Sequence, residues 1–187
     1  MRGLLCTEFL EFTGVRYGCS AEQAGGAPCD RDSCPGPQHV LTRAEGVAGR
    51  TGVPAPLLLE LFGMALFDRL VRGYPAFFVG IESTLDLVAR FETHVVAEVG
   101  QLDPAARLPL LAVVRRPRRP LEVSYRSPHG LIDLAYGLLL GSVAHFGESL
   151  DIRRHDRGRT ARFRVHARRT VKGAGDRQAR GGAAVAS

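Results

Sequence analysis

The segment Leu121–Gly141, LEVSYRSPHGLIDLAYGLLLG, joins a strand pattern directly to an apolar helix pattern. Its first part carries Tyr125, Ser127 and His129 at alternate positions. Because side chains alternate faces along a strand, these three groups are expected on one side of a sheet, beside the helix. A phenol, a hydroxyl and an imidazole placed together could bind the acid groups of a largely apolar ligand.

The first half of the chain has helical patterns, and the second half has two hairpin patterns around one helix. Helices are expected at 1–18, 39–50 and 81–99, with a further helix from about Pro54 to about Val71 and a bulky turn at 74–78. Strands are expected at 110–114, 121–125, 150–155 and 161–166, and the helix between the hairpins at 130–146. This order predicts an α+β domain, with an N-terminal helical subdomain and a C-terminal antiparallel sheet packed with a helix.

We expect one domain over residues 1–170, followed by a disordered tail at 171–187 that has little apolar bulk. No apolar run reaches the roughly 20 residues that a membrane span needs. Glu8 and Glu11 interrupt the opening segment where a signal peptide would be apolar. The expected location is therefore cytoplasmic, without membrane association.

The formal net charge is +6, and nearly all the positive charge is arginine, clustered at 115–119 and 153–169. Such clusters fit either an electrostatic footprint for nucleic acid or an acidic partner, or a solvated surface. No recognition helix or aromatic–basic interleaving accompanies them. A solvated surface is the favoured interpretation, and no nucleic-acid partner is expected.

Four cysteines in a cytoplasmic chain are expected to be thiols rather than disulfides. Cys29, Cys34 and His39 have the residue types for zinc but lack the tight Cys-x2-Cys spacing, and Cys19 could supply a further ligand. This set is a weak zinc or redox-sensor candidate. No catalytic constellation is present, because the histidines are scattered and no phosphate loop or nucleophile motif occurs, so we do not expect an enzyme.

Tyr125-x-Ser127-x-His129 resembles the Tyr-x-Ser-x-Arg signature of the heme–nitric oxide/oxygen binding (H-NOX) family, which includes the sensor domain of soluble guanylate cyclase. Other segments similar to the bacterial members follow in the same order: MRGLLCTEFLEF at the start, GVPAP at 52–56, FGMALF at 62–67, YPAFFVG at 74–80, and glycines at 137 and 141. The resemblance implies a stand-alone bacterial-type domain with heme b, whose propionates Tyr125, Ser127 and His129 would hold. His129 stands where the family has arginine, which binds carboxylates bidentately and with permanent charge.

The resemblance leaves the axial ligand of the iron open between two registers. The family places its ligating histidine twelve residues before a proline, and counting back from Pro109 gives Val96. The nearest histidine is His94, and two helical residues are about 200° apart around the axis. With a two-residue insertion before Pro109, His94 would ligate iron. Without it, a valine would occupy the proximal position.

The resemblance also implies the ligand and the partners. Oxygen-binding members carry a distal tyrosine at the position of Leu134, so an apolar wall of Leu134, Leu138 and Leu5 favours NO over O2. Tyr136 is expected to face elsewhere on the helix. Signalling would pass to a separate histidine kinase or cyclic-di-nucleotide enzyme. The alternative is a heme-free H-NOX scaffold that acts through protein contacts or another ligand, which Val96 and His129 favour.

Overall fold

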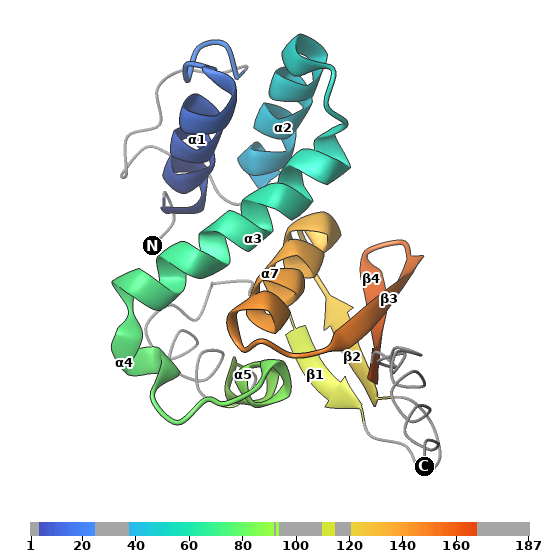
Figure 1. The fold of residues 1–187 in the computed structure, drawn as a ribbon. Coiled ribbons are helices and arrows are strands. Elements are labelled where there is room, and N and C mark those ends of the chain that lie inside the picture. Colours follow the sequence, from blue (N-terminus) through green and yellow to red (C-terminus); the bar gives the residue numbers. More distant parts are fainter. Residues whose placement is uncertain (1–3, 25–37, 92, 94–109, 115–120, 168–187) are drawn as a thin grey trace, which may run out of the picture.

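The computed structural model describes residues 4–24, 38–91, 93, 110–114 and 121–167. In these residues an N-terminal group of helices packs on a helix that also covers a four-stranded sheet (Figure 1). The expected fold class, α+β with a helical part followed by an antiparallel sheet and its helix, is confirmed. Residues 171–187 lie outside the described residues, so the expected tail stays a prediction.

Three long helices form the N-terminal part: α1 (Leu4–Tyr17), α2 (Gln38–Thr51) and α3 (Ala55–Gly73). They match the expected helices, and α3 begins directly after Pro54, with Pro56 in its first turn, where a missing N–H is tolerated. Phe9 packs edge-on against Phe62 in their shared core, with ring centroids 5.1 Å apart. Burial of these large aromatic rings is what fastens α1 to α3.

The corner after α3 differs from the expected turn. Residues 75–78 form one helical turn, α4 (Pro75–Phe78), and α5 (Thr84–Arg90) follows. The expected helix at 81–99 therefore begins three residues late, because Ser83 caps it by accepting a hydrogen bond from the Asp86 backbone N–H at 3.1 Å. The remainder of that expected helix, apart from Phe91 and Thr93, lies outside the described residues.

Both expected hairpins are present, and they pair through β2 and β4. The strands are β1 (Leu110–Val114), β2 (Leu121–Arg126), β3 (Leu150–Arg157) and β4 (Thr160–Ala167), in the order β1-β2-β4-β3, all antiparallel. The β3–β4 turn has two residues, and Gly158 adopts a positive φ of 60° there. Glycine adopts this conformation without strain, which suits a tight hairpin turn.

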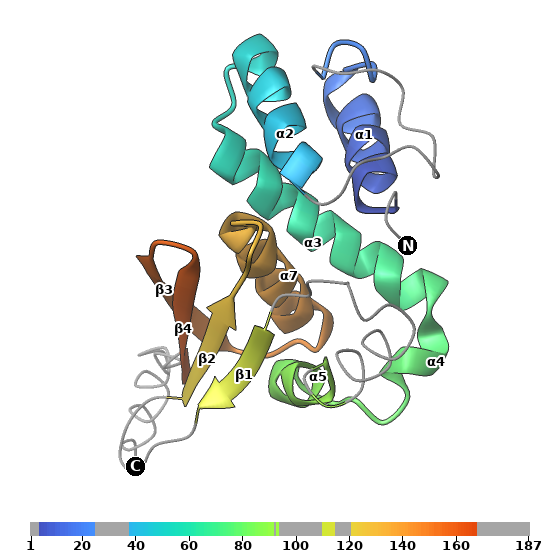
Figure 2. The ribbon, with the colours of Figure 1, turned by 180° about the vertical axis from the view of Figure 1, so that it is seen from behind.

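Helix α7 (Ile132–His145) lies between the helical part and the sheet (Figures 1 and 2). Leu131 and Leu134 belong to the core shared with α1–α3, whereas Ala135 and Leu139 belong to the core on the sheet. The sequence predicted that this helix packs on the sheet, and the structure shows that it contributes to both cores, because it carries buried apolar side chains toward each of them.

Glycines allow α7 and α3 to lie against each other backbone to backbone. A Cβ at Gly63 would lie 2.5 Å from the Leu134 carbonyl oxygen, and one at Gly137 would collide with the carbonyl of Glu60. A Cβ at Gly141 would lie 2.8 Å from the Cβ of Phe67. Any larger side chain at these positions would push the two helices apart.

A buried polar network fastens α5 to the end of α7. The backbone N–H of Thr84 donates to Glu148 Oε2 at 3.1 Å, and its hydroxyl donates to the same oxygen. The Ser142 hydroxyl lies 3.1 Å from Thr84 Oγ1 and donates to the Leu139 carbonyl at 2.8 Å. Thr84 and Ser142 are fully buried, so these bonds satisfy groups that would otherwise be costly to bury.

No helix among the described residues is both long enough and apolar enough to cross a bilayer.

Candidate functional site

The candidate site lies where β2 ends and the chain turns into α7. Tyr125 is on the strand and points inward, but β2 ends at Arg126, so Ser127 and His129 lie in the following turn. The expectation that all three side chains alternate along one strand is therefore wrong. Pro128 has no N–H to continue the ladder, and Gly130 turns the chain with a φ of 72°. Arg126 is exposed on the opposite face from Tyr125, as expected for a regular strand.

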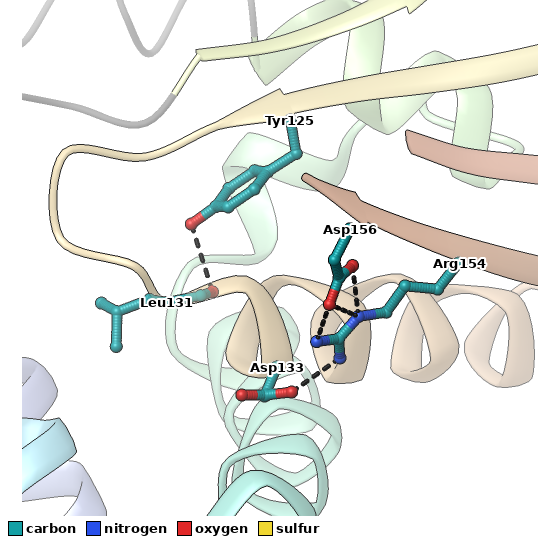
Figure 3. A network of polar contacts seen from close by, with 5 residues as sticks. All are labelled: Tyr125, Leu131, Asp133, Arg154 and Asp156. Atoms are coloured by element: carbon teal, nitrogen blue, oxygen red, sulfur yellow. Dashed lines mark hydrogen bonds and ion pairs between the residues drawn. The ribbon is translucent and has the colours of Figure 1, made fainter. Parts of the chain in front are cut away.

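The hydroxyls of Tyr125 and Ser127 are both buried, with the residues 3% and 2% exposed. The Tyr125 hydroxyl donates to the carbonyl oxygen of Leu131 at 3.2 Å (Figure 3). Burial raises the pKa of Tyr125, and a hydrogen bond from Ser127 partly offsets this rise in the pKa. The turn therefore holds two hydroxyls together in an apolar setting.

His129 is half-buried in the turn, and its backbone N–H donates to Ser127 Oγ at 3.1 Å. Within the described residues its imidazole forms no hydrogen bond or ion pair. An imidazole N–H here can donate a hydrogen bond to an anion. The side chains of Tyr125 and Ser127 are thus joined by a hydrogen bond, whereas the imidazole of His129 is not bonded to either of them.

An ion-pair network borders this turn, and it was not among the residues singled out from the sequence. Arg154 on β3 donates from its two terminal nitrogens to Asp133 Oδ1 at 2.6 Å and to Asp156 Oδ2 at 2.5 Å (Figure 3). Hydrogen bonding to Asp156 is the main cause that raises the pKa of Arg154, and the bond to Asp133 acts in the same direction. Asp133 lies in the first turn of α7, so the network ties β3 to the start of that helix.

Tyr136 faces the sheet, as expected, and not the wall formed by Leu134. Its ring stacks on Phe163 with centroids 5.8 Å apart, and its hydroxyl donates to the Ile152 carbonyl at 3.3 Å. The guanidinium of Arg154 lies 5.8 Å from the ring centroid, close enough for a cation–π contact. Tyr136 is therefore occupied by structural contacts on the sheet side of α7.

The three expected wall leucines share one core. Leu134 is buried, 5% exposed, in the cluster that contains Phe9 and Phe62, and Leu5 and Leu138 pack against that cluster. These residues offer apolar contact and no hydrogen-bond donor from their side chains. Pocket lining and ordinary core packing would both use such residues.

The remaining candidates lie partly outside the described residues. These are His94 and Val96, the two axial-ligand candidates, Pro109, which was expected with Leu5, Leu134 and Leu138 in the heme pocket, and Cys29 and Cys34 of the zinc set. Cys19 is a buried free thiol whose Sγ lies 3.8 Å from the Tyr17 carbonyl oxygen. His39 has a buried Nδ1 without a hydrogen-bond partner in the described part of the chain. In that part no group of three or more metal-ligand side chains comes together.

The fold is that of solved H-NOX proteins. The unliganded Fe(II) H-NOX protein from K. algicida is 21% identical, with a TM-score of 0.73 over 91% of this chain and 98% of that chain. The H-NOX protein from S. oneidensis in the Fe(II)NO state is 18% identical, with a TM-score of 0.73 over 89% of this chain and 98% of that one. The S. oneidensis H-NOX domain in the Fe(II)CO state is 21% identical, with a TM-score of 0.73 over 91% of this chain and 100% of that chain.

A family model described as "Haem-NO-binding" matches residues 37–154, which is more than half of the chain. A comparison with curated proteins gives no match. The chain belongs to the haem-NO-binding, or H-NOX, family, as its signature residues indicated.

Proposed function

We propose that this chain is a heme-based gas sensor domain that responds to NO and signals to a separate protein. The observation that carries the proposal is the family match over 37–154, which includes the turn with Tyr125 and Ser127 and the whole of α7. Bound heme would supply a ferrous iron that binds a diatomic gas. The proposed signalling partner is a histidine kinase or a cyclic-di-nucleotide enzyme in a bacterial cytoplasm.

The chemistry of the described residues fits heme b. The hydroxyls of Tyr125 and Ser127 and the imidazole of His129 are donors suited to propionate carboxylates. Leu134, Leu138 and Leu5 provide apolar contact for a porphyrin face. Without a distal donor at position 134, bound O2 would lack a hydrogen bond, which favours NO.

His94 is the proposed axial ligand, with Val96 at the proximal position as the alternative register. Both follow α5, whose first turn is held by Glu148 and Ser142. In the heme-bound protein His94 would hold the iron, and the buried network would fix the start of α5. The contact between the helical part and the sheet would be the two-state element through which gas binding is signalled.

The second candidate is a heme-free scaffold that acts through protein contacts. One observation favours it: the Tyr125 hydroxyl already donates to Leu131, and Ser127 Oγ already accepts from His129. Propionates would have to compete with bonds that the protein forms internally.

The deciding experiment is the absorption spectrum of the protein produced with added heme precursor, reduced, under CO and under NO. We expect a Soret band that shifts with NO and changes in His94→Ala but not in His155→Ala, an exposed histidine on β3. An unchanged spectrum in His94→Ala would remove His94 as ligand. A folded, colourless protein that stays colourless with hemin would overturn heme sensing and support the heme-free scaffold.

A further inference from the structure

One face of the sheet is strongly basic, and no helix among the described residues lies on it. Helix α7 lies on the inner face, with Val123, Tyr125 and Phe163 in the core between them. Side chains alternate along each strand, so the neighbours of these residues point outward. No described helix covers this outer face (Figures 1 and 2). We call it the basic sheet face, and its arginines are Arg126, Arg153, Arg157, Arg162 and Arg164.

The strand register brings like charges together on the basic sheet face. Arg153 on β3 is directly opposite Arg164 on β4. Like charges at directly opposed positions repel and destabilise a sheet. A surface that retains such pairs without a structural benefit is a candidate for a binding role.

Acidic side chains within the face neutralise only part of this charge. Arg164 pairs with Glu122 at 2.9 Å, and Arg153 pairs with Asp151 at 3.3 Å, although the Arg153 side chain is still 70% exposed. Within the described residues Arg126, Arg157 and Arg162 form no ion pair. The basic sheet face therefore keeps several guanidinium groups free to bind carboxylates or phosphates.

The two segments that adjoin the paired strands β2 and β4 in the sequence carry more basic than acidic side chains. Residues 168–187 follow β4 and add five basic side chains against a single acid, Asp176. The β1–β2 connection is also basic, with arginines at 115, 116, 118 and 119. A second copy would repel the first, because each carries a formal net charge of +6.

We propose that the basic sheet face is a docking surface for an acidic surface of another protein. Two features favour protein over nucleic acid. The outward strand positions of this face carry no Phe, Tyr or Trp side chain on which a base could stack. Glu122 and Asp151 place carboxylates among the arginines, and these carboxylates would repel phosphates.

This inference goes beyond the proposed gas sensing and does not depend on heme. The longest strands, β3 and β4, have eight residues each, at about 3.4 Å per residue and about 4.8 Å between strands. The basic sheet face is therefore small, and a small charged interface suits a transient, salt-sensitive contact. Arginine is also enriched in protein interfaces relative to the rest of the surface.

The test is an NMR titration of the ¹⁵N-labelled full chain with a poly-L-glutamate peptide of defined length. We expect amide shifts concentrated on β2, β3 and β4, and an affinity that falls as salt is added. The double variant Arg153→Gln/Arg162→Gln should bind the peptide roughly tenfold more weakly and remain folded, because it removes repulsion. The matched control, Arg50→Gln/Arg72→Gln, changes the net charge equally at exposed positions on α2 and α3 and should bind as the parent does.

A parallel titration uses an oligothymidylate with the same number of negative charges. Shifts spread over the helices, or equal weakening in the control variant, would show attraction to net charge alone and overturn the proposal. Tighter binding of the oligonucleotide to the basic sheet face would overturn it in favour of a nucleic-acid partner. Because the titration needs no heme, its failure leaves the gas-sensing proposal standing.

Discussion

The hydroxyl of Tyr125 donates to the carbonyl oxygen of Leu131 at 3.2 Å and so closes the turn between β2 and α7. Tyr125 belongs to the core on the sheet, and Leu131 belongs to the core of the helical part. The bond thus joins the two halves of the molecule at the signature turn. Anything that binds at this turn would act on the contact between the halves.

Tyr125→Phe removes this bond and the Ser127 contact but keeps the ring. The Leu131 carbonyl still accepts from the Ala135 N–H at 3.1 Å, so it is not left unsatisfied. We therefore expect the free energy of unfolding to fall by only about 1 kcal/mol, measured by urea denaturation. Tyr136→Phe, which removes the bond to Ile152 from a less buried ring, should cost less. An equal or larger loss in Tyr136→Phe would contradict this ranking.

Stability should decline at alkaline pH because of Tyr125. Its pKa is raised in the folded state above the ordinary value of 10.0, chiefly by burial, so the folded protein holds the phenol proton more tightly. This contribution is complete below the unfolded pKa and is lost as pH rises through the folded pKa. Urea midpoints from neutral pH to about pH 11 should fall less steeply in Tyr125→Phe than in the parent. Parallel declines would show that other groups cause the loss, with Tyr136, whose pKa is also raised, as the next candidate.

Gly137→Ala should be strongly destabilising, because its methyl group would collide with the Glu60 carbonyl on α3. We expect a loss of about 2–4 kcal/mol in the free energy of unfolding. Gly49→Ala is the matched control, since a Cβ at that helical position meets nothing within 4 Å. It should stabilise by about 0.5–1 kcal/mol through helix propensity. Similar effects of the two changes would argue against the close approach of α3 and α7.

Arg154→Gln should destabilise the junction of β3 and α7. The change leaves Asp133 and Asp156 without their guanidinium partner, and the Asp133 side chain is only 19% exposed. A loss of about 1–3 kcal/mol is expected by thermal or urea denaturation. Arg153→Gln, one residue earlier on the exposed face, should change stability by less than about 0.5 kcal/mol. A larger effect at Arg153 than at Arg154 would refute the structural role of this network.

Leu134→Tyr tests the gas preference proposed for the heme-bound protein. A tyrosine hydroxyl at the distal position would give bound O2 a hydrogen bond that leucine cannot provide. We expect a stable O2 spectrum in this variant but not in the parent or in Leu134→Phe, which has the same ring without the hydroxyl. A stable O2 complex in the parent would contradict selection for NO.

The fold could be predicted from the sequence because its patterns are local. The α1 and α2 helices, both hairpins and α7 follow apolar spacing and turn residues, and most boundaries agree within a few residues. The period-two pattern failed after Arg126, where a proline and a glycine with positive φ replace the strand. An alternating pattern identifies the side chains that would share one face if the strand continued. The strand ends before Pro128, which has no N–H to continue the hydrogen-bond ladder.

The network around Arg154 could not be predicted in the same way. Asp133 and Arg154 are 21 residues apart in the chain, and their contact depends on how α7 lies on the sheet. One signal was present: Arg154 has the same strand parity as buried Ile152, so it had to point inward and needed a partner. The division of the arginines into one inward-facing residue and an outward-facing set likewise required the observed strand register.

Helix α7 supplies side chains to both cores, and this has a consequence for how the molecule unfolds. Loss of the sheet would leave Ala135 and Leu139 exposed to water, and loss of the helices would do the same to Leu131 and Leu134. If either half unfolded alone, the α7 side chains that it buries would become exposed to water. The helical part and the sheet should therefore unfold in a single cooperative transition. Unfolding curves followed by helix content and by tyrosine fluorescence should coincide.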